Sequence, residues 1–199
     1  VMEGMLIGAY AIGATEGYIY SRAEYPLAIV RLKIALKQME AYGLIGSHIL
    51  GSDFSFDLYA HPGYGAYICG EETALLESLE GKKGQPRFKP PFPASFGLYG
   101  KPTTINNTET FAAVPWIMRK GGDAFLALGR PNNGGTKLFS VTGHVAKPGN
   151  YEVKLGTPFA RLLEMAGGMR GGKKLKAVIP GGSSMPVLPA DIMMATDMD

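Results

Sequence analysis

The run Gly65-Ala66-Tyr67-Ile68-Cys69-Gly70-Glu71-Glu72-Thr73 decides how the first part of the chain is interpreted. Glycine is followed by two adjacent carboxylates, at the start of a helix expected over 71–80 and stopped by Gly81. Helix N-termini carry partial positive charge and unpaired N–H groups, so they stabilise carboxylates and bind polar ligand groups. Adjacent helical positions lie about 100° apart, so Glu71 and Glu72 are expected to point in different directions. One carboxylate can face a ligand while the other has a structural role within the protein. Taken alone, the pair could also simply offset the helix dipole.

The residues before this run alternate helix and strand signals. A strand is expected at 17–20, and a period-two pattern predicts a second strand at 54–59. Between them, 26–42 carries apolar residues at near-helical spacing, at Leu27, Val30, Ile34 and Met39. A glycine turn at Gly63 and Gly65 and a brief extended step at 67–68 then lead into the carboxylate helix. This is the pattern of an α/β crossover.

A long proline-rich loop follows. Prolines at 86, 90, 91, 93 and 102 exclude a regular helix or a central strand between Lys82 and Thr104. Its segment Arg87–Pro93 carries cations and two aromatic side chains. An aromatic ring on a stiff loop can stack on adenine, and a lysine can bind a phosphate or a ribose hydroxyl. Packing against the domain surface is the alternative for the same residues.

The run from Thr103 to Thr110 leads into another helix, expected from Thr108 to Arg119 and weakened by Pro115. Asn107 or Thr108 would make a good N-cap, with Thr110 in the first turn. A phosphate fits such a helix end, although these residues could also merely cap it.

From Lys137 the pattern changes to short strands and turns. Strands are expected at 138–142, 149–153 and 177–179, with one helix at 157–166, which predicts a small α+β module. Proline, asparagine and glycine cluster between Arg130 and Thr136. The sequence therefore predicts two domains, 1–133 and 134–199.

Composition excludes several classes of function. Hydrophobic residues make up 46% and charged residues 19% of the 199 residues, which is typical of a soluble globular protein. A diffuse net charge of +3 argues against nucleic-acid binding. Apolar stretches are interrupted well before the roughly 20 residues of a membrane span, so no direct membrane insertion is expected. Cys69 is the only cysteine and the histidines show no ligand spacing, so no metal site is expected.

Three ordered runs, 65–75, 89–92 and 100–110, together resemble a known family: the FMN- and NADH-binding subunit of bacterial and mitochondrial complex I. The diaphorase subunits of NAD-reducing hydrogenases and formate dehydrogenases share this region. Residues 138–189 look like the small SLBB-like β-grasp module that the family carries after its flavin domain. The resemblance implies an α/β fold class, with a partial Rossmann-like flavin/NADH-binding domain followed by this α+β module.

The resemblance also implies roles for ten residues. Tyr67, Gly70, Glu71 and Glu72 would line the flavin. Glu72 would also lie near the nicotinamide, which makes it the expected catalytic residue. Lys89 and Phe92 would contact the ribose and adenine of NADH. The ribityl phosphate would be held by Ile105, Asn106, Asn107 and Thr110.

Other family features do not occur in this sequence, namely the upstream glycine-rich flavin loop, the Asn-Asp-Glu segment and the Cys-x-x-Cys-x-x-Cys cluster. The chain is therefore expected to be an interior fragment that is inactive alone and lacks the ligands of the parent's 4Fe–4S cluster. In the parent, FMN would accept hydride from NADH and electrons would pass through iron–sulfur clusters to quinone.

The implied partners are NADH and other subunits of a complex I-type assembly, especially a 2Fe–2S thioredoxin-like subunit. The implied location is cytoplasmic, peripheral to the inner membrane. Two alternatives stay open: a hydrogenase or formate dehydrogenase diaphorase subunit, and a non-catalytic interaction module that works through its β-grasp half.

Overall fold

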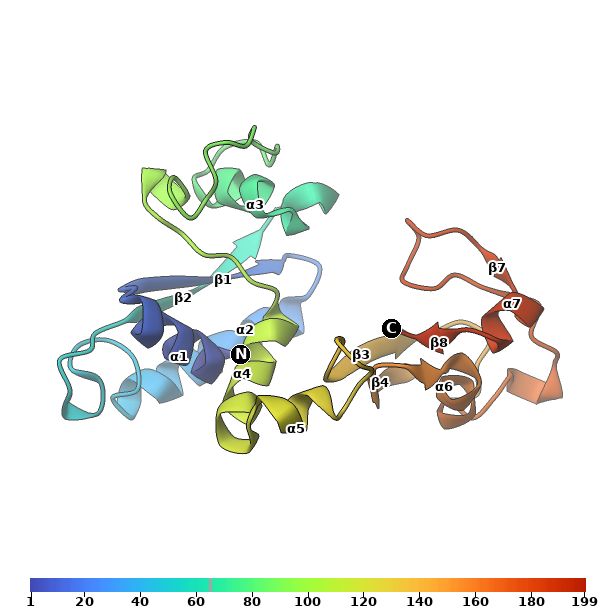
Figure 1. Ribbon diagram of the computed structural model, residues 1–199. Coiled ribbons are helices and arrows are strands. Elements are labelled where there is room, and N and C mark those ends of the chain that lie inside the picture. Colours follow the sequence, from blue (N-terminus) through green and yellow to red (C-terminus); the bar gives the residue numbers. More distant parts are fainter. Residues whose placement is uncertain (65) are drawn as a thin grey trace. The chain divides into compact units, whose positions relative to one another are not determined.

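The computed structural model describes residues 1–64 and 66–199, so Gly65 of the predicted turn lies outside the described residues. These residues form two compact units, Val1–Pro115 and Trp116–Asp199, shown in Figure 1. Each unit has a hydrophobic core of its own. Among the described residues, no helix combines the length and the apolar character needed to cross a bilayer.

The first unit is built on a pair of parallel strands. Its elements are α1 (Met2–Ile12), β1 (Glu16–Arg22), α2 (Pro26–Ala41), the short 3-10 helix η1 (Ile49–Gly51), β2 (Asp57–Gly63), the 3-10 helix η2 (Tyr67–Gly70), α3 (Glu72–Leu79), the 3-10 helix η3 (Leu98–Gly100) and α4 (Thr108–Lys120), which continues into the second unit. Strand β1 pairs with β2 in parallel, with Glu16 opposite Asp57 and Arg22 opposite Gly63. The connection through α2 confirms the predicted crossover, since parallel neighbours need a long connection.

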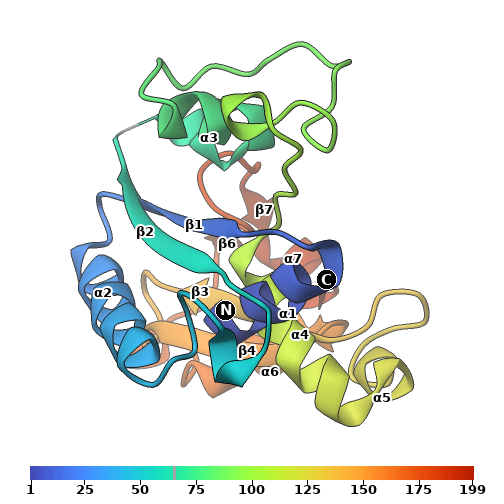
Figure 2. The same cartoon turned by 90° about the vertical axis from the view of Figure 1, so that its left-hand side faces the viewer.

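The two faces of this sheet carry different side chains because side chains alternate along a strand. Ile19 and Leu58 are buried on one face, in a core shared with Ala9 of α1. On the other face the rings of Tyr18 and Tyr59 stack with centroids 5.3 Å apart. Helix α3 lies on this second side in both views (Figures 1 and 2). Helices α1 and α2 therefore pack against the first face of the sheet, and α3 lies on the second.

A hydrogen bond ties α3 to the sheet. The hydroxyl groups of Tyr20 and Ser78 lie 2.8 Å apart. This contact fixes α3, which begins at Glu72 directly after its N-cap Glu71, against the second face of β1.

Helix α1 also positions the start of α4. A Cβ atom at Gly4 would overlap the backbone carbonyl of Phe111, so only glycine allows this approach of the two helices. The first turns of α4, which include Thr110 of the predicted phosphate residues, are thereby held against α1.

Two local predictions around the carboxylate run were wrong. Gly63 is the last residue of β2 rather than part of a turn, and the absence of a side chain there leaves room for the ring of Tyr20. Tyr67 and Ile68 are not extended, because the N–H groups of Cys69 and Glu71 bond to carbonyls three residues back and form η2.

The structure also corrects the bounds of the second strand and the face that α2 turns towards the core. The second strand runs from Asp57 to Gly63 instead of 54–59, since Phe56 forms only an isolated bridge with Gly46. In α2, the apolar residues Leu27, Val30 and Ile34 are exposed. The residues that contact the core are instead Leu32 and Leu36.

The second unit confirms the predicted α+β module. It contains α5 (Gly122–Leu126), β3 (Thr136–Val141), β4 (Gly149–Lys154), β5 (Thr157–Pro158), α6 (Phe159–Met165), the 3-10 helix η4 (Arg170–Gly172), β6 (Ala177–Val178), β7 (Leu188–Pro189), α7 (Ala190–Met194) and β8 (Asp197–Met198). Strands β3 and β4 pair antiparallel, as do the two short pairs β5–β8 and β6–β7. Its core contains Phe159 and Leu162 of α6 and Met193 of α7.

Candidate functional site

Glu71 is the N-cap of α3 rather than a residue within the helix. Its backbone is extended, with φ −70° and ψ 134°, and its Oε2 accepts the N–H groups of Thr73 at 3.0 Å and Ala74 at 2.9 Å. The hydroxyl of Thr73 donates to the same oxygen at 2.7 Å. Burial alone would raise the pKa of Glu71, but the hydrogen bonds from Thr73, Ala74 and Lys89 outweigh burial and lower it. One carboxylate of the pair thus serves the protein as a helix cap.

Glu72 is the first residue of α3, and its side chain is 40% exposed. Its Oε1 accepts a hydrogen bond from Lys89 Nζ at 2.5 Å, and Oε1 of Glu71 lies 3.4 Å from the same nitrogen. The two carboxylates therefore converge on one ammonium, which corrects the expectation that they point apart. That expectation assumed that both residues were helical. The hydrogen bond to Glu72 is the main cause of the raised pKa of Lys89.

Three more predicted residues near the start of α3, namely Tyr67, Gly70 and Phe92, are exposed to solvent. Tyr67 and Gly70 form the ends of η2, immediately before the cap, and both are exposed. The ring of Phe92 is 59% exposed, while its carbonyl accepts the N–H groups of Ser95 and Phe96 and so orders the turn that carries it. An exposed ring on an ordered turn is free to stack on a planar ligand.

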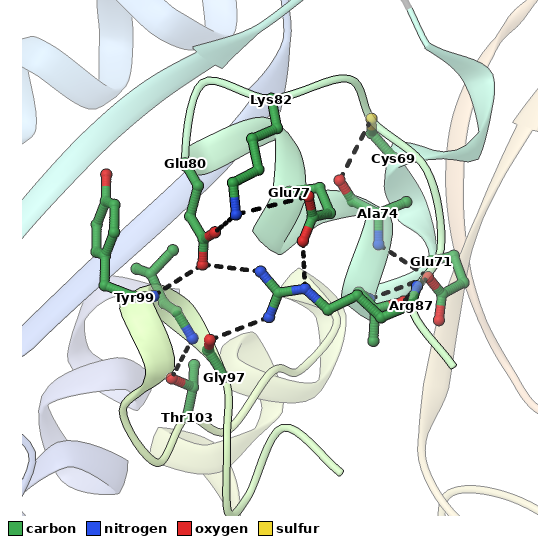
Figure 3. A network of polar contacts seen from close by, with 12 residues as sticks. Cys69, Glu71, Ala74, Glu77, Glu80, Lys82, Arg87, Gly97, Tyr99 and Thr103 are labelled. Carbon is green, nitrogen blue, oxygen red and sulfur yellow. Dashed lines mark hydrogen bonds and ion pairs between the residues drawn. The ribbon is translucent and has the colours of Figure 1, made fainter. Parts of the chain in front are cut away.

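The loop that carries Lys89 and Phe92 is fastened to α3 by Arg87 (Figure 3). The guanidinium of Arg87 donates to Glu77, to Oε1 of Glu80 at 2.8 Å and to the carbonyl of Gly97 at 3.1 Å. The sequence pattern indicated only a stiff loop bearing a cation and aromatics, and the anchoring role of Arg87 was missed. Two glutamates three residues apart on the preceding helix were the available signal, because such residues share a helix face.

The remaining predicted residues lie at the start of α4. Asn107 caps this helix, since its Oδ1 accepts the N–H of Glu109 at 2.8 Å, and Thr110 is exposed in the first turn. Asn107, rather than the alternative Thr108, is therefore the cap. Just before it, Ile105 and Asn106 line a cavity of about 750 Å³ that also contacts α1, β1 and the apolar side of α3.

The described structure thus places the ten predicted residues in two groups within the first unit. Among these ten, only Ile105 and Asn106 line the cavity. Glu71, Glu72 and Lys89 are joined by direct contacts at the start of α3. Within residues 1–64 and 66–199, no three His, Cys, Asp or Glu side chains come together as a metal site.

Comparisons with known proteins give matches to both parts of the chain. Residues 1–116 match a family model described as the Nuo51 FMN-binding domain, and residues 138–188 match the SLBB domain. The chain is 55% identical over 201 residues to an NADH-quinone oxidoreductase subunit of Rickettsia bellii, and all of this chain covers 48% of that protein. For the corresponding NADH-quinone oxidoreductase protein of Rhodobacter capsulatus, identity is 54%, with coverage of 100% of this chain and 47% of the relative. The chain therefore spans about half the length of these curated relatives.

A solved structure has the same fold. A chain of an NAD⁺-reducing [NiFe]-hydrogenase in the H₂-reduced state aligns with a TM-score of 0.83 and 38% identity, covering 96% of this chain and 32% of the hydrogenase chain. The likeness includes both units and confirms the predicted fold class.

Proposed function

Because the chain belongs to the Nuo51 FMN-binding domain family, we propose that its parent protein oxidises NADH with FMN as the hydride acceptor and passes the electrons through iron–sulfur clusters to quinone. The observation that carries this proposal is the match of residues 1–116, the region that contains both groups of predicted site residues. FMN supplies the chemistry of hydride acceptance and single-electron release, while the protein supplies binding and orientation.

The donor groups at the start of α4 fit a phosphorylated flavin. A helix N-terminus with a capping amide and an exposed hydroxyl offers neutral and partly positive donors to a phosphate. Asn107, Thr110 and the neighbouring Ile105 and Asn106 would hold the ribityl phosphate beside the cavity of about 750 Å³, a volume in the range of small-molecule sites. Tyr67, Gly70, Glu71 and Glu72 would line the flavin from the α3 side.

The α3 group offers complementary features to NADH. Phe92 presents an exposed ring for adenine, and Lys89 presents an ammonium for the ribose hydroxyls. Lys89 is held between Glu71 and Glu72, so it would reach the ribose while keeping a carboxylate partner. Glu72 does not cap the helix and its side chain is partly exposed, so it would be able to orient the nicotinamide ring of NADH.

The wider setting is part of the same proposal. The parent would carry a 4Fe–4S cluster, assemble with a 2Fe–2S thioredoxin-like subunit, and lie on the cytoplasmic side, peripheral to the inner membrane. The relatives are themselves named as subunits of an NADH-quinone oxidoreductase, which supports membership of a larger assembly. The similarity to the NAD⁺-reducing hydrogenase supports the second candidate, a diaphorase subunit. Purification of the native complex separates the two, because only the hydrogenase assembly reduces NAD⁺ with H₂.

The enzymatic proposal predicts a clear difference between the full-length parent and the 199-residue chain. The FMN-loaded parent is expected to oxidise NADH with ferricyanide as acceptor. The isolated chain is expected to show no turnover above that of free FMN, because the glycine-rich half of the family's flavin site is not among its residues. Steady-state absorbance assays on both proteins, with FMN-free parent as control, measure this. An inactive FMN-loaded parent would contradict the proposed function.

We also propose the domain division 1–133 and 134–199, which places the boundary after α5, whereas the two compact units divide between Pro115 and Trp116. Glycine, asparagine and proline between 130 and 136 support it, since backbone breaks and exposed polar residues are typical of domain boundaries. Limited proteolysis is expected to cut within 130–136 and leave two stable products. Cuts confined to 82–104 would argue against this boundary.

A further inference from the structure

We propose that Arg87 is a positioning residue that sets where Lys89 and Phe92 stand relative to Glu71 and Glu72, and thereby controls recognition of the adenosine half of NADH. This inference rests on the proposed function. It follows from the way in which one arginine joins both ends of α3 to Gly97 in the loop that follows.

The side chain of Arg87 is held by a rigid set of acceptors. Its Nη2 donates to Glu80, its Nη1 to the carbonyl of Gly97, and its Nε to Glu77. Only 21% of the Arg87 side chain and 7% of the Glu80 side chain is exposed. A planar guanidinium can serve three acceptors in fixed directions, whereas the compact ammonium of lysine cannot reproduce that geometry.

These acceptors link Arg87, at the start of the segment 87–97, both to α3 and to Gly97 at the end of the same segment. Glu77 and Glu80 belong to α3 and its C-cap, and Gly97 lies ten residues after Arg87. Lys89 and Phe92 lie within this ten-residue segment. Because the guanidinium bonds to Gly97 as well as to α3, it fixes the two ends of the segment relative to each other and to the helix.

The backbone of Arg87 adds a second link, directly to the cap of α3. Its N–H donates to Oγ1 of Thr73 at 2.8 Å, and the hydroxyl of Thr73 donates to Oε2 of Glu71 at 2.7 Å. Thr73 is 1% exposed, so this relay is shielded from water (Figure 3 shows the surrounding network). The loop position and the Glu71 carboxylate are therefore set by one continuous chain of hydrogen bonds.

This arrangement predicts a selective effect on binding. If the Arg87 anchor is lost, the loop moves, while Glu72 stays on α3 and the nicotinamide end keeps its partner. Misplacement of a binding group by about 1 Å can reduce the rate up to a hundredfold. Such a loss would fall on the ribose and adenine contacts of Lys89 and Phe92, and not on the chemistry at the nicotinamide.

The test uses the full-length, FMN-loaded parent with Arg87→Gln and Arg87→Lys. In Arg87→Gln we expect the KM for NADH and the Kd of ADP-ribose, measured by calorimetry, to rise about tenfold, with kcat changed by less than about twofold. Arg87→Lys should show a smaller rise in both. With reduced nicotinamide mononucleotide, which lacks the adenosine half, kcat/KM should stay at the wild-type value in both variants.

Lys82→Gln is the matched control. The Lys82 ammonium pairs with Oε2 of Glu80 at 2.7 Å and with Glu77 at 3.9 Å, but from the exposed side and without touching Gly97 or Thr73. This variant removes a cation from the same two carboxylates and should leave the KM for NADH, the Kd of ADP-ribose and both kinetic constants, kcat with NADH and kcat/KM with reduced nicotinamide mononucleotide, at wild-type values.

An unchanged Kd for ADP-ribose in Arg87→Gln would overturn the inference. So would an equal loss with NADH and with reduced nicotinamide mononucleotide, because that result indicates general damage to the site. If Arg87→Gln does not fold, Arg87→Lys decides by the same readouts. A wild-type parent that does not oxidise NADH would refute the proposed function itself. An active wild type whose Arg87 variants keep the wild-type KM for NADH and Kd of ADP-ribose would reject only the positioning role.

Discussion

In the FMN-loaded parent, Glu72→Gln is expected to slow NADH oxidation by about five- to a hundredfold, more than Glu71→Gln does. In the structure Glu71 and Glu72 make different contacts, since only Glu71 caps α3. Oε2 of Glu71 is bound by two backbone N–H groups and one hydroxyl, and its Oε1 makes a longer contact of 3.4 Å with Lys89, whereas the hydrogen bond to Glu72 comes from Lys89 at 2.5 Å. Glu72 is therefore the carboxylate available to a ligand.

The size of the effect follows from the loss of one charge beside the bound nucleotide. An isosteric amide keeps the volume of Glu72 but adds donors and leaves Lys89 without its nearer partner. In a partly desolvated site such a change costs about 1–3 kcal/mol. At a factor of ten per 1.4 kcal/mol, this gives the expected range in rate or affinity.

Glu71→Gln should instead act mainly on stability. The loss of an N-cap acceptor costs about 0.5–2 kcal/mol, and the amide oxygen of glutamine can retain part of that cap. Steady-state kinetics and thermal unfolding of both flavin-loaded variants measure the two effects separately. Equal losses of NADH turnover in the two variants would sink the assignment of Glu72 as the residue near the nicotinamide.

Local sequence patterns predicted the elements that depend on short-range physics. Strand β1, helix α2 and helix α4 were found because alternation, helical spacing and capping leave signals within a few residues. The cap at Asn107 is one such signal, since an amide before a helix accepts an N–H of its own first turn. The two-residue strands β5 and β8 carried no such pattern, because a period cannot appear in two residues.

The same reasoning failed where long-range contacts decide the structure. Gly63 has the local pattern of a turn residue, but its place opposite Arg22 in the sheet makes it a strand residue. Arg87 finds its acceptors at Glu77, Glu80 and Gly97, and a linear pattern does not show that they meet.

The candidate site shows the same limit. The resemblance supplied the roles of its residues, but the convergence of Glu71 and Glu72 on Lys89 became visible only in three dimensions. Helical spacing predicted that the two side chains diverge because it treated both residues as helical. In the structure Glu71 has an extended backbone and the helix begins only at Glu72.

The buried carboxylate of Glu80 should make the first unit sensitive to acid. Burial alone would raise the pKa of Glu80, but hydrogen bonds from Lys82, Arg87 and the N–H of Tyr99 outweigh it and lower the pKa to about 2, from an ordinary value of 4.5. A folded-state pKa below the unfolded one means that the stabilisation is complete above about pH 4.5 and is lost as pH falls towards 2. At about 1.4 kcal/mol per pKa unit, the contribution is at most about 3.5 kcal/mol.

Urea unfolding of the wild type and of Glu80→Gln across this range tests the expectation. At pH 7 the variant should be less stable by up to about 3.5 kcal/mol, and the difference should shrink steadily below pH 4.5, because the wild-type carboxyl then takes up a proton on unfolding. Glu24→Gln is the control, since Glu24 pairs with Arg22 at 3.2 Å but both side chains are half exposed. An exposed pair of this kind is screened by solvent and contributes little, so this variant should follow the wild type at every pH. A stability difference for Glu80→Gln that stays constant from about pH 7 to about pH 2.5 would show that the lost contacts, and not the charge of Glu80, hold the loop to α3.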